Sequence, residues 1–147
     1  MFKLIIYGFI LVLLSSTTVY IFLTSKNATV SSIKLDSIGK MTTTIMHDLD
    51  KALPLIEKAG YKISTVEAEL SVPPEITTIF ELVNNVDRKK QEQILKSLEG
   101  NKIGVLVLSS LMKSFALNKE MAIKRMKLKM IHVTIALPPY ITLEYEK

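Results

Sequence analysis

The sequence contains no cysteine, no tryptophan and only two histidines among its 147 residues. Without cysteine, the chain has no thiol nucleophile and no thiolate ligands for a metal. It also has no glycine-rich phosphate-binding loop and no low-complexity tract. The absence of cysteine is compatible with any compartment, so it does not locate the protein.

The charge balance is close to neutral for a chain of this length. There are 19 basic and 14 acidic residues, which gives a formal net charge of +5. Nucleic-acid-binding domains carry a stronger basic bias, so this composition does not favour nucleic acid as a partner.

The longest uncharged stretch, Leu4–Leu23, lies between Lys3 and Lys26. A helix of that length spans the hydrocarbon core of a bilayer, which is about 30 Å thick. We therefore expect residues 1–25 to form a single-pass transmembrane anchor that contacts membrane lipid through residues 4–23. A cleaved signal segment is the alternative, but the chain turns apolar again after a run of hydroxyl residues and lacks a small-x-small cleavage site.

The orientation in the membrane follows less directly from the sequence. Lysines are more frequent after the apolar stretch than before it, which would keep the following domain inside. A long domain is translocated largely regardless of its charge, and the short basic start is typical of a signal-anchor. We expect an extracytoplasmic domain, joined to the anchor by a small, polar juxtamembrane linker over residues 26–36.

The sequence repeats itself at an offset of 65 residues. The segments that align without a gap are Val66–Glu81 (VEAELSVPPEITTIFE) and Ile131–Glu146 (IHVTIALPPYITLEYE). The alternating apolar positions coincide, and so do the two proline pairs. Proline interrupts a strand ladder, so each pair is predicted to separate two strands. An internal repeat of this kind indicates a fold made of two similar halves.

The alternation slips by one residue at the same aligned place in both halves. Apolar side chains occupy odd positions up to Thr65 and even positions from Val66; in the second half the change comes at Ile131. One extra residue in a strand is what a β-bulge inserts. We therefore predict bulges near Thr65–Val66 and near Met130–Ile131.

Helical periodicity precedes each predicted strand pair. Apolar residues recur at three- and four-residue steps from Ile38 to Ile56, with Asp36 or Ser37 as the expected cap. The corresponding helix of the second half is predicted at 103–119, although its first six residues (IGVLVL) could also form a buried strand. A third, mostly polar helix is predicted at 87–98, with Asp87 at its start.

These patterns predict an α+β fold: the transmembrane helix, then one small domain over residues 37–147. We expect a first αββ repeat at 37–83, a connecting helix within 84–101 and a second αββ repeat at 102–147. Such repeats indicate an antiparallel or mixed sheet with its helices on one face, and we expect pseudo-twofold symmetry.

No set of side chains with catalytic spacing is apparent. His47 lies beside Asp48 on a polar helix face, where neighbouring residues point in different directions. His132 alternates with apolar residues on a strand, and Glu67 with Glu69 forms at most a carboxylate pair on a solvent-facing strand. We therefore predict no catalytic residues, no metal, no cofactor and a non-enzymatic protein.

The densest basic segment is Lys119–Lys129 (KEMAIKRMKLK). On a strand, Arg125, Lys127 and Lys129 would point the same way and could contact anionic lipid or an acidic partner. The alternative is a solvated face, or protection of an edge strand by lysine. No aromatic residues interleave with this row, which argues against nucleic acid.

The sequence thus predicts a membrane-anchored interaction module, an accessory component of a membrane or envelope complex that binds a protein partner or itself. The alternative is a membrane-proximal domain that binds lipid or a small apolar ligand in an interior pocket between sheet and helices. An enzyme built on carboxylates or hydroxyls is the third candidate.

Overall fold

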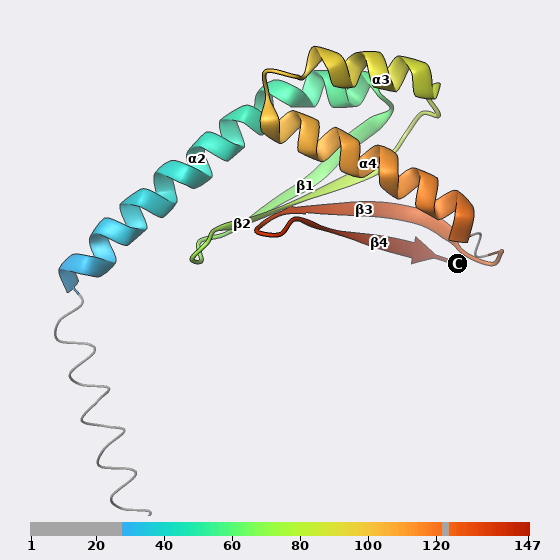
Figure 1. Cartoon of the computed structure of the whole chain (residues 1–147). Coiled ribbons are helices and arrows are strands. Elements are labelled where there is room, and N and C mark those ends of the chain that lie inside the picture. Colours follow the sequence, from blue (N-terminus) through green and yellow to red (C-terminus); the bar gives the residue numbers. More distant parts are fainter. Residues whose placement is uncertain (1–27, 122–123) are drawn as a thin grey trace, which may run out of the picture. The chain divides into compact units, whose positions relative to one another are not determined.

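The computed structural model describes residues 28–121 and 124–147, with side chains from Leu35 onward. The predicted membrane anchor lies outside the described residues. The elements follow one another in the order α2 (Ala28–Lys58), β1 (Tyr61–Glu69), β2 (Glu75–Leu82), α3 (Arg88–Ser97), α4 (Lys102–Met121), β3 (Lys127–Ile135) and β4 (Tyr140–Glu146) (Figure 1). Among the described residues, no helix is both long and apolar enough to cross a bilayer.

The four strands form one antiparallel sheet in the order β1-β2-β3-β4. The helix α4 and the C-terminal part of α2 cover one face of this sheet, and α3 lies on the same side, packed against α4 (Figure 1). The prediction of an α+β fold with an antiparallel sheet is confirmed. The IGVLVL segment is helical, as predicted, and lies within α4. The predicted start of α3 is also confirmed, because the Asp87 carboxylate accepts a hydrogen bond of 3.2 Å from the amide of Lys89.

The start of the first helix differs from the prediction. The chain divides into two units, Met1–Ser37 and Ile38–Lys147, and α2 runs through this boundary. Because residues 28–36 of the expected linker already belong to α2, the expected cap at Asp36 or Ser37 is wrong. Neither cap residue breaks a helix, and residues 28–36 contain no glycine or proline that would.

The two β-hairpins have the same pairing register. Lys62 pairs with Glu81 and Ala68 with Ile76; shifted by 65 residues, these are the pairs Lys127–Glu146 and Val133–Ile141. Each ladder shifts once, between Ile63 and Thr65 and between Leu128 and Met130. The predicted bulges are therefore confirmed, one to two residues earlier than expected.

The predicted pseudo-twofold symmetry is wrong. In the antiparallel order β1-β2-β3-β4, β1 and β3 run in the same direction. A twofold axis through the sheet would reverse that direction. The second hairpin instead lies beside the first, with its strands running in the same directions, by a shift across the sheet combined with the twist of the sheet.

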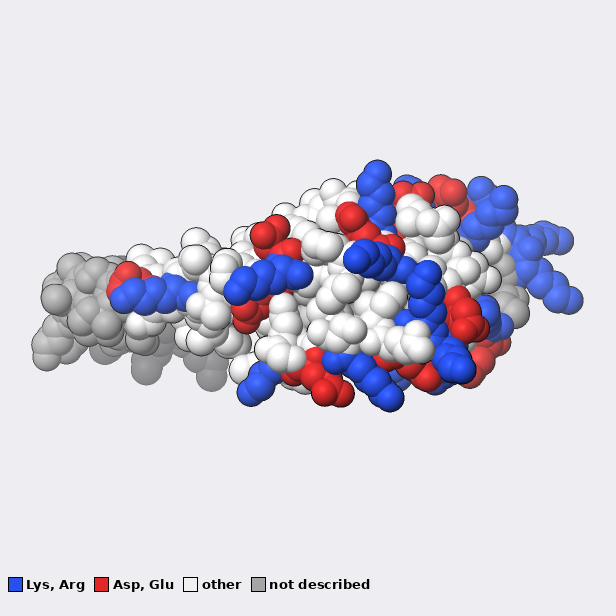
Figure 2. All heavy atoms as spheres, turned by 90° about the horizontal axis from the view of Figure 1, so that it is seen from above, with Lys and Arg blue, Asp and Glu red and all other residues white. Residues whose placement is uncertain are grey.

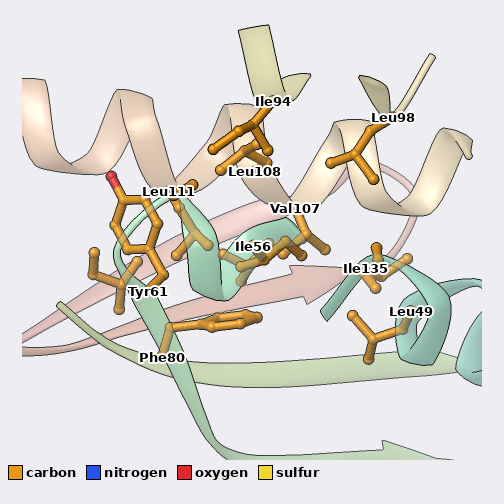
Figure 3. Packing of buried hydrophobic residues seen from close by; sticks show 14 of the residues in the cluster. Leu49, Ile56, Tyr61, Phe80, Ile94, Leu98, Val107, Leu108, Leu111 and Ile135 are labelled. Carbon is orange, nitrogen blue, oxygen red and sulfur yellow. The ribbon is translucent and has the colours of Figure 1, made fainter. Parts of the chain in front are cut away.

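The core fills the space between the sheet and the helices (Figure 3). Its fully buried side chains include Leu49 and Ile56 from α2, Ile76 and Phe80 from β2, Val107, Leu108 and Leu111 from α4, and Ile131 and Val133 from β3. Ala52 and Gly104 lie at the close approach of α2 to α4, where a Cβ on Gly104 would be 2.7 Å from that of Ala52. Burial of this apolar surface is the main stabilising term.

A tight connection joins α2 to β1. Gly60 has a φ of 100°, a conformation that residues with a Cβ rarely adopt, and its carbonyl accepts bonds from the amides of Val83 and Asn84. Nearby, the buried Gln91 donates from Nε2 to the carbonyl of Ala59 at 2.9 Å and lies 3.5 Å from the hydroxyl of Tyr61. These contacts fix where β1 begins under α3.

Both hairpin turns lie at the same end of the sheet, as the strand order requires. They are the uncharged segments 70–74 (LSVPP) and 136–139 (ALPP). Leu70, Val72 and Leu137 are 60%, 74% and 84% exposed. The hydroxyl of Tyr140 lies 3.5 Å from the Glu75 carboxylate, which brings the two turns side by side.

Candidate functional site

In the predicted contact row on β3, one lysine is paired with a carboxylate of the neighbouring strand β4. Lys129 Nζ lies 3.1 Å from Glu144 Oε1, and Lys127 pairs in register with Glu146. Arg125 is exposed and precedes the strand. The structure therefore does not bring Arg125, Lys127 and Lys129 together as an unmatched cationic surface.

Glu144 joins two basic side chains on the uncovered face of the sheet. Its Oε2 lies 3.2 Å from His132 Nε2, so the carboxylate bridges His132 and Lys129. The hydrogen bond from Lys129, and after it the one with His132, lowers the pKa of Glu144, and the bond with Glu144 raises the pKa of Lys129. The cluster links β3 to β4.

The other titratable residues singled out in the sequence do not converge. His47 Nδ1 lies 3.9 Å from the carboxylate of Asp48 on an exposed helix face. Glu67 and Glu69 are exposed on β1, where Glu69 pairs with Glu75. In the described part of the chain, no three His, Asp or Glu residues are grouped closely enough to hold a metal ion.

A groove of about 730 Å³ lies between α3 and α4. Its apolar floor consists of Val86, Leu95, Met112, Phe115 and Ala116, all of them half-buried. The remaining lining residues are Asn85, Asp87, Arg88, Gln91, Ser109, Lys113 and Lys119. We call this the α3–α4 groove.

The rim of the groove is mainly basic. Arg88, Lys113 and Lys119 are exposed at its edge, against the single carboxylate of Asp87. Arg88 Nε is 3.1 Å from Glu92, and Lys119 Nζ lies 4.5 Å from the centre of the Phe115 ring. Figure 2, which views the helix side, shows Lys and Arg side chains gathering toward its right-hand end.

A second, smaller hollow of about 460 Å³ adjoins the first and shares Phe115 with it. It is lined by Leu82, Phe115, Asn118, Lys124, Met126, Lys127 and Leu128. Of the three predicted contact residues, only Lys127 lines either hollow. Phe115 is thus the side chain common to both concave surfaces.

Sequence reasoning missed the groove. Met112, Phe115, Ala116 and Lys119 recur at helical spacing, so they share one face of α4. That spacing was the available signal, but it could equally mark a core-facing stripe. Only the packing of α3 beside α4 shows that this face remains open.

Comparison with family models, with curated proteins and with solved structures finds no match to this chain.

Proposed function

We propose that this chain is a single-pass membrane-anchored, non-enzymatic interaction module whose α3–α4 groove binds an acidic, amphipathic segment of a protein partner. The observation that carries the proposal is the pairing of a half-buried apolar floor with a basic rim. Partner helices lay their apolar faces into grooves of this kind. Complementary charge at the rim steers the encounter and sets the orientation.

The membrane part of the proposal rests on the uncharged stretch Leu4–Leu23. The anchor would hold the domain beside the bilayer, on its extracytoplasmic side, as an accessory component of a membrane or envelope complex. Anchoring also raises the effective concentration of the groove near other membrane proteins, so a modest intrinsic affinity suffices.

The domain architecture in this proposal is two αββ repeats joined by α3. The equal offset of both ladders and of both bulges supports a duplication. In it, α2 corresponds to α4 and each hairpin to the other. The groove lies beside the connecting helix, which has no counterpart in the first repeat.

A lipid or small apolar ligand is the second candidate. The groove volume of about 730 Å³ lies within the range of small-molecule sites, about 300–1,000 Å³. The space between sheet and helices is filled by buried side chains such as Phe80 and Leu108, so a ligand there would have to displace the core. We therefore propose the α3–α4 groove as the binding site both for a protein segment and, in the alternative, for a lipid or small apolar ligand.

Photocrosslinking in the membranes of the host cell tests the proposal. A photoreactive phenylalanine analogue replaces Ala116 in the groove and, as control, exposed Glu57 on α2. We expect a discrete protein adduct from the first position only. Lys113→Glu with Lys119→Glu should abolish it, whereas the matched charge change Lys51→Glu with Lys58→Glu should leave it intact.

The mass of the adduct separates the two candidates. A lipid-sized adduct at position 116 would favour the ligand-binding alternative. No adduct, or one that survives the two groove substitutions, would contradict the proposed role of the groove.

A further inference from the structure

The edge strand β1 has the same apolar positions as β3 on the face toward the helices, but its side chains there are less buried. On β3, Ile131, Val133 and Ile135 are 1%, 0% and 7% exposed. Their counterparts 65 residues earlier are Val66, Ala68 and Leu70, of which Ala68 and Leu70 are exposed. The positions are apolar in both strands, but only β3 has a strand on each side.

The other edge strand, β4, stands in the same relation to β2. Ile76, Thr78 and Phe80 of β2 are fully buried. Their counterparts on β4, which are Ile141, Leu143 and Tyr145, are only half-buried. The hydroxyl of Tyr145 is buried without a hydrogen-bond partner. The two edge strands therefore resemble the two central strands: β1 has the apolar positions of β3, and β4 has those of β2. We call the contact between β2 and β3 the β2–β3 seam.

The register of that seam matches the two edges to each other. Within the chain, Ile76 pairs with Ile135, Thr78 with Val133 and Phe80 with Ile131. Adding 65 to each β2 residue gives its equivalent on β4, and subtracting 65 from each β3 residue gives its equivalent in or just after β1. The resulting pairs are Ile141–Leu70, Leu143–Ala68 and Tyr145–Val66. Five of the six side chains are aliphatic and the sixth is the ring of Tyr145. Those within the strands lie on the face that the helices cover in the centre of the sheet.

The helices match in the same way. The close contact of Ala52 with Gly104 becomes, after the same shift, a contact of Leu117 with Gly39. Leu117 is 40% exposed, and nothing lies within 4 Å of a Cβ placed on Gly39. The exposed Leu117 of one molecule could therefore pack on the open position at Gly39 of the next, as Ala52 packs on Gly104 within the chain.

We propose that β4 of one copy of this chain pairs with β1 of a second copy in the β2–β3 register, so that the sheet continues from one molecule to the next. The relation between neighbours would be the one that relates the two hairpins within the chain, which is a shift across the sheet combined with the twist of the sheet. A contact of this type does not close and produces rows.

One pair opposes the association. In the same register Glu67 of the second copy faces Glu144, and like charges directly opposite each other are destabilising. The hydrogen bonds from Lys129 and His132 offset part of the charge on Glu144. The seam between molecules is therefore weaker than the seam within one, and Glu67→Gln strengthens it.

Disulfide trapping tests the proposal, because the native chain has no cysteine. Within the chain the hydroxyls of Thr77 and Thr134 lie 3.0 Å apart. Their equivalents across the new seam are Thr142 and Glu69, both exposed. Full-length chains carrying either Thr142→Cys or Glu69→Cys, with different tags, are mixed in lipid vesicles at low density and oxidised.

We expect the mixed disulfide to exceed both homodisulfides. Adding Glu67→Gln should increase its yield, and Ala68→Lys, a substitution at an exposed position, should abolish it. A chain carrying both cysteines should give a ladder of multimers.

An excess of either homodisulfide would show a twofold pairing of like edges and overturn the proposal, as would a random distribution or no crosslink. The same mixture in detergent micelles separates this outcome from a failure of the anchor. Crosslinks in micelles alone would support the pairing of β4 with β1 and contradict its formation between chains anchored in one bilayer. The photo-adduct at position 116 reports on the groove independently.

Discussion

The side chain of Asn101 donates from Nδ2 to the carbonyl of Asp48 at 2.6 Å, and so ties the start of α4 to the middle of α2. Its Oδ1 accepts a bond of 2.8 Å from the amide of Gly104, in the first turn of α4. One residue therefore caps a helix and fixes that helix against its neighbour.

The substitution Asn101→Ala should lower the free energy of unfolding by about 1–3 kcal/mol, because it removes the cap of α4 and the side-chain hydrogen bond to the Asp48 carbonyl of α2. Asn101→Asp keeps the acceptor for Gly104 and loses the donor, so we expect an intermediate loss. Denaturant unfolding of the purified full-length chain measures both. Equal stability of all three chains would contradict the double role of Asn101.

The aligned glycines Gly104 and Gly39 should respond in opposite ways to alanine. At Gly104 the new Cβ meets Ala52 at 2.7 Å and Leu98 at 3.1 Å. Overpacking costs about 1–3 kcal/mol and exceeds the gain of about 1 kcal/mol in helix propensity, so Gly104→Ala should destabilise. Gly39→Ala meets nothing within 4 Å and should stabilise by about 0.5–1 kcal/mol.

A double-mutant cycle checks the cause of this difference. Adding Ala52→Gly to Gly104→Ala should recover part of the lost stability, because it removes the atom that the new Cβ meets. Strictly additive losses would mean that the helices do not approach as closely as described.

The carboxylate of Glu144 should make stability fall at acid pH. Its pKa is lowered from the ordinary value of 4.5, first by the hydrogen bond from Lys129. A carboxyl group with a lower pKa in the folded state contributes stability above its unfolded pKa, and this is lost as the pH falls through the folded pKa. Titration of the carboxyl carbon by NMR should show the low pKa, and Lys129→Met should raise it. Lys62→Met, on another strand, should not.

Tyr61 should make stability fall at alkaline pH. Burial raises the pKa of this phenol above its ordinary value of 10.0, so the folded state resists ionisation. Above about pH 10 the unfolded chain loses the Tyr61 proton more readily, which favours unfolding. The slope of stability against pH in that range should be shallower in Tyr61→Phe. An unchanged slope would mean that Tyr61 does not carry this effect.

Local patterns predicted the hairpins well, because a strand displays its buried face as an alternation and a bulge as a slip in that alternation. The slip at Val66 and the one at Ile131 predicted two bulges, and the ladders contain both. The repeat also resolved the ambiguity of the IGVLVL segment, which lies in α4 as its aligned counterpart lies in α2.

What failed depends on contacts between distant elements. The pairing of Lys129 with Glu144 could not be predicted, because this carboxylate reaches the lysine only through the β3–β4 register. That Phe115 lines an open groove follows only from the position of α3 beside α4. The order of the strands follows from the β2–β3 pairing, which leaves no local signal in the sequence. This order is also what rules out the predicted twofold axis.

The two hairpin turns have a consequence for the domain as a whole. They leave the sheet at one end, where Leu137 is 84% exposed and residues 70–74 and 136–140 carry no charge. Lys124, Arg125 and Lys127 lie at the opposite end, where β3 begins. One end of the sheet is therefore uncharged and apolar, and the other end is basic. A domain with this polarity has one favoured orientation at an interface between water and an apolar phase, with the hairpin turns toward the apolar side.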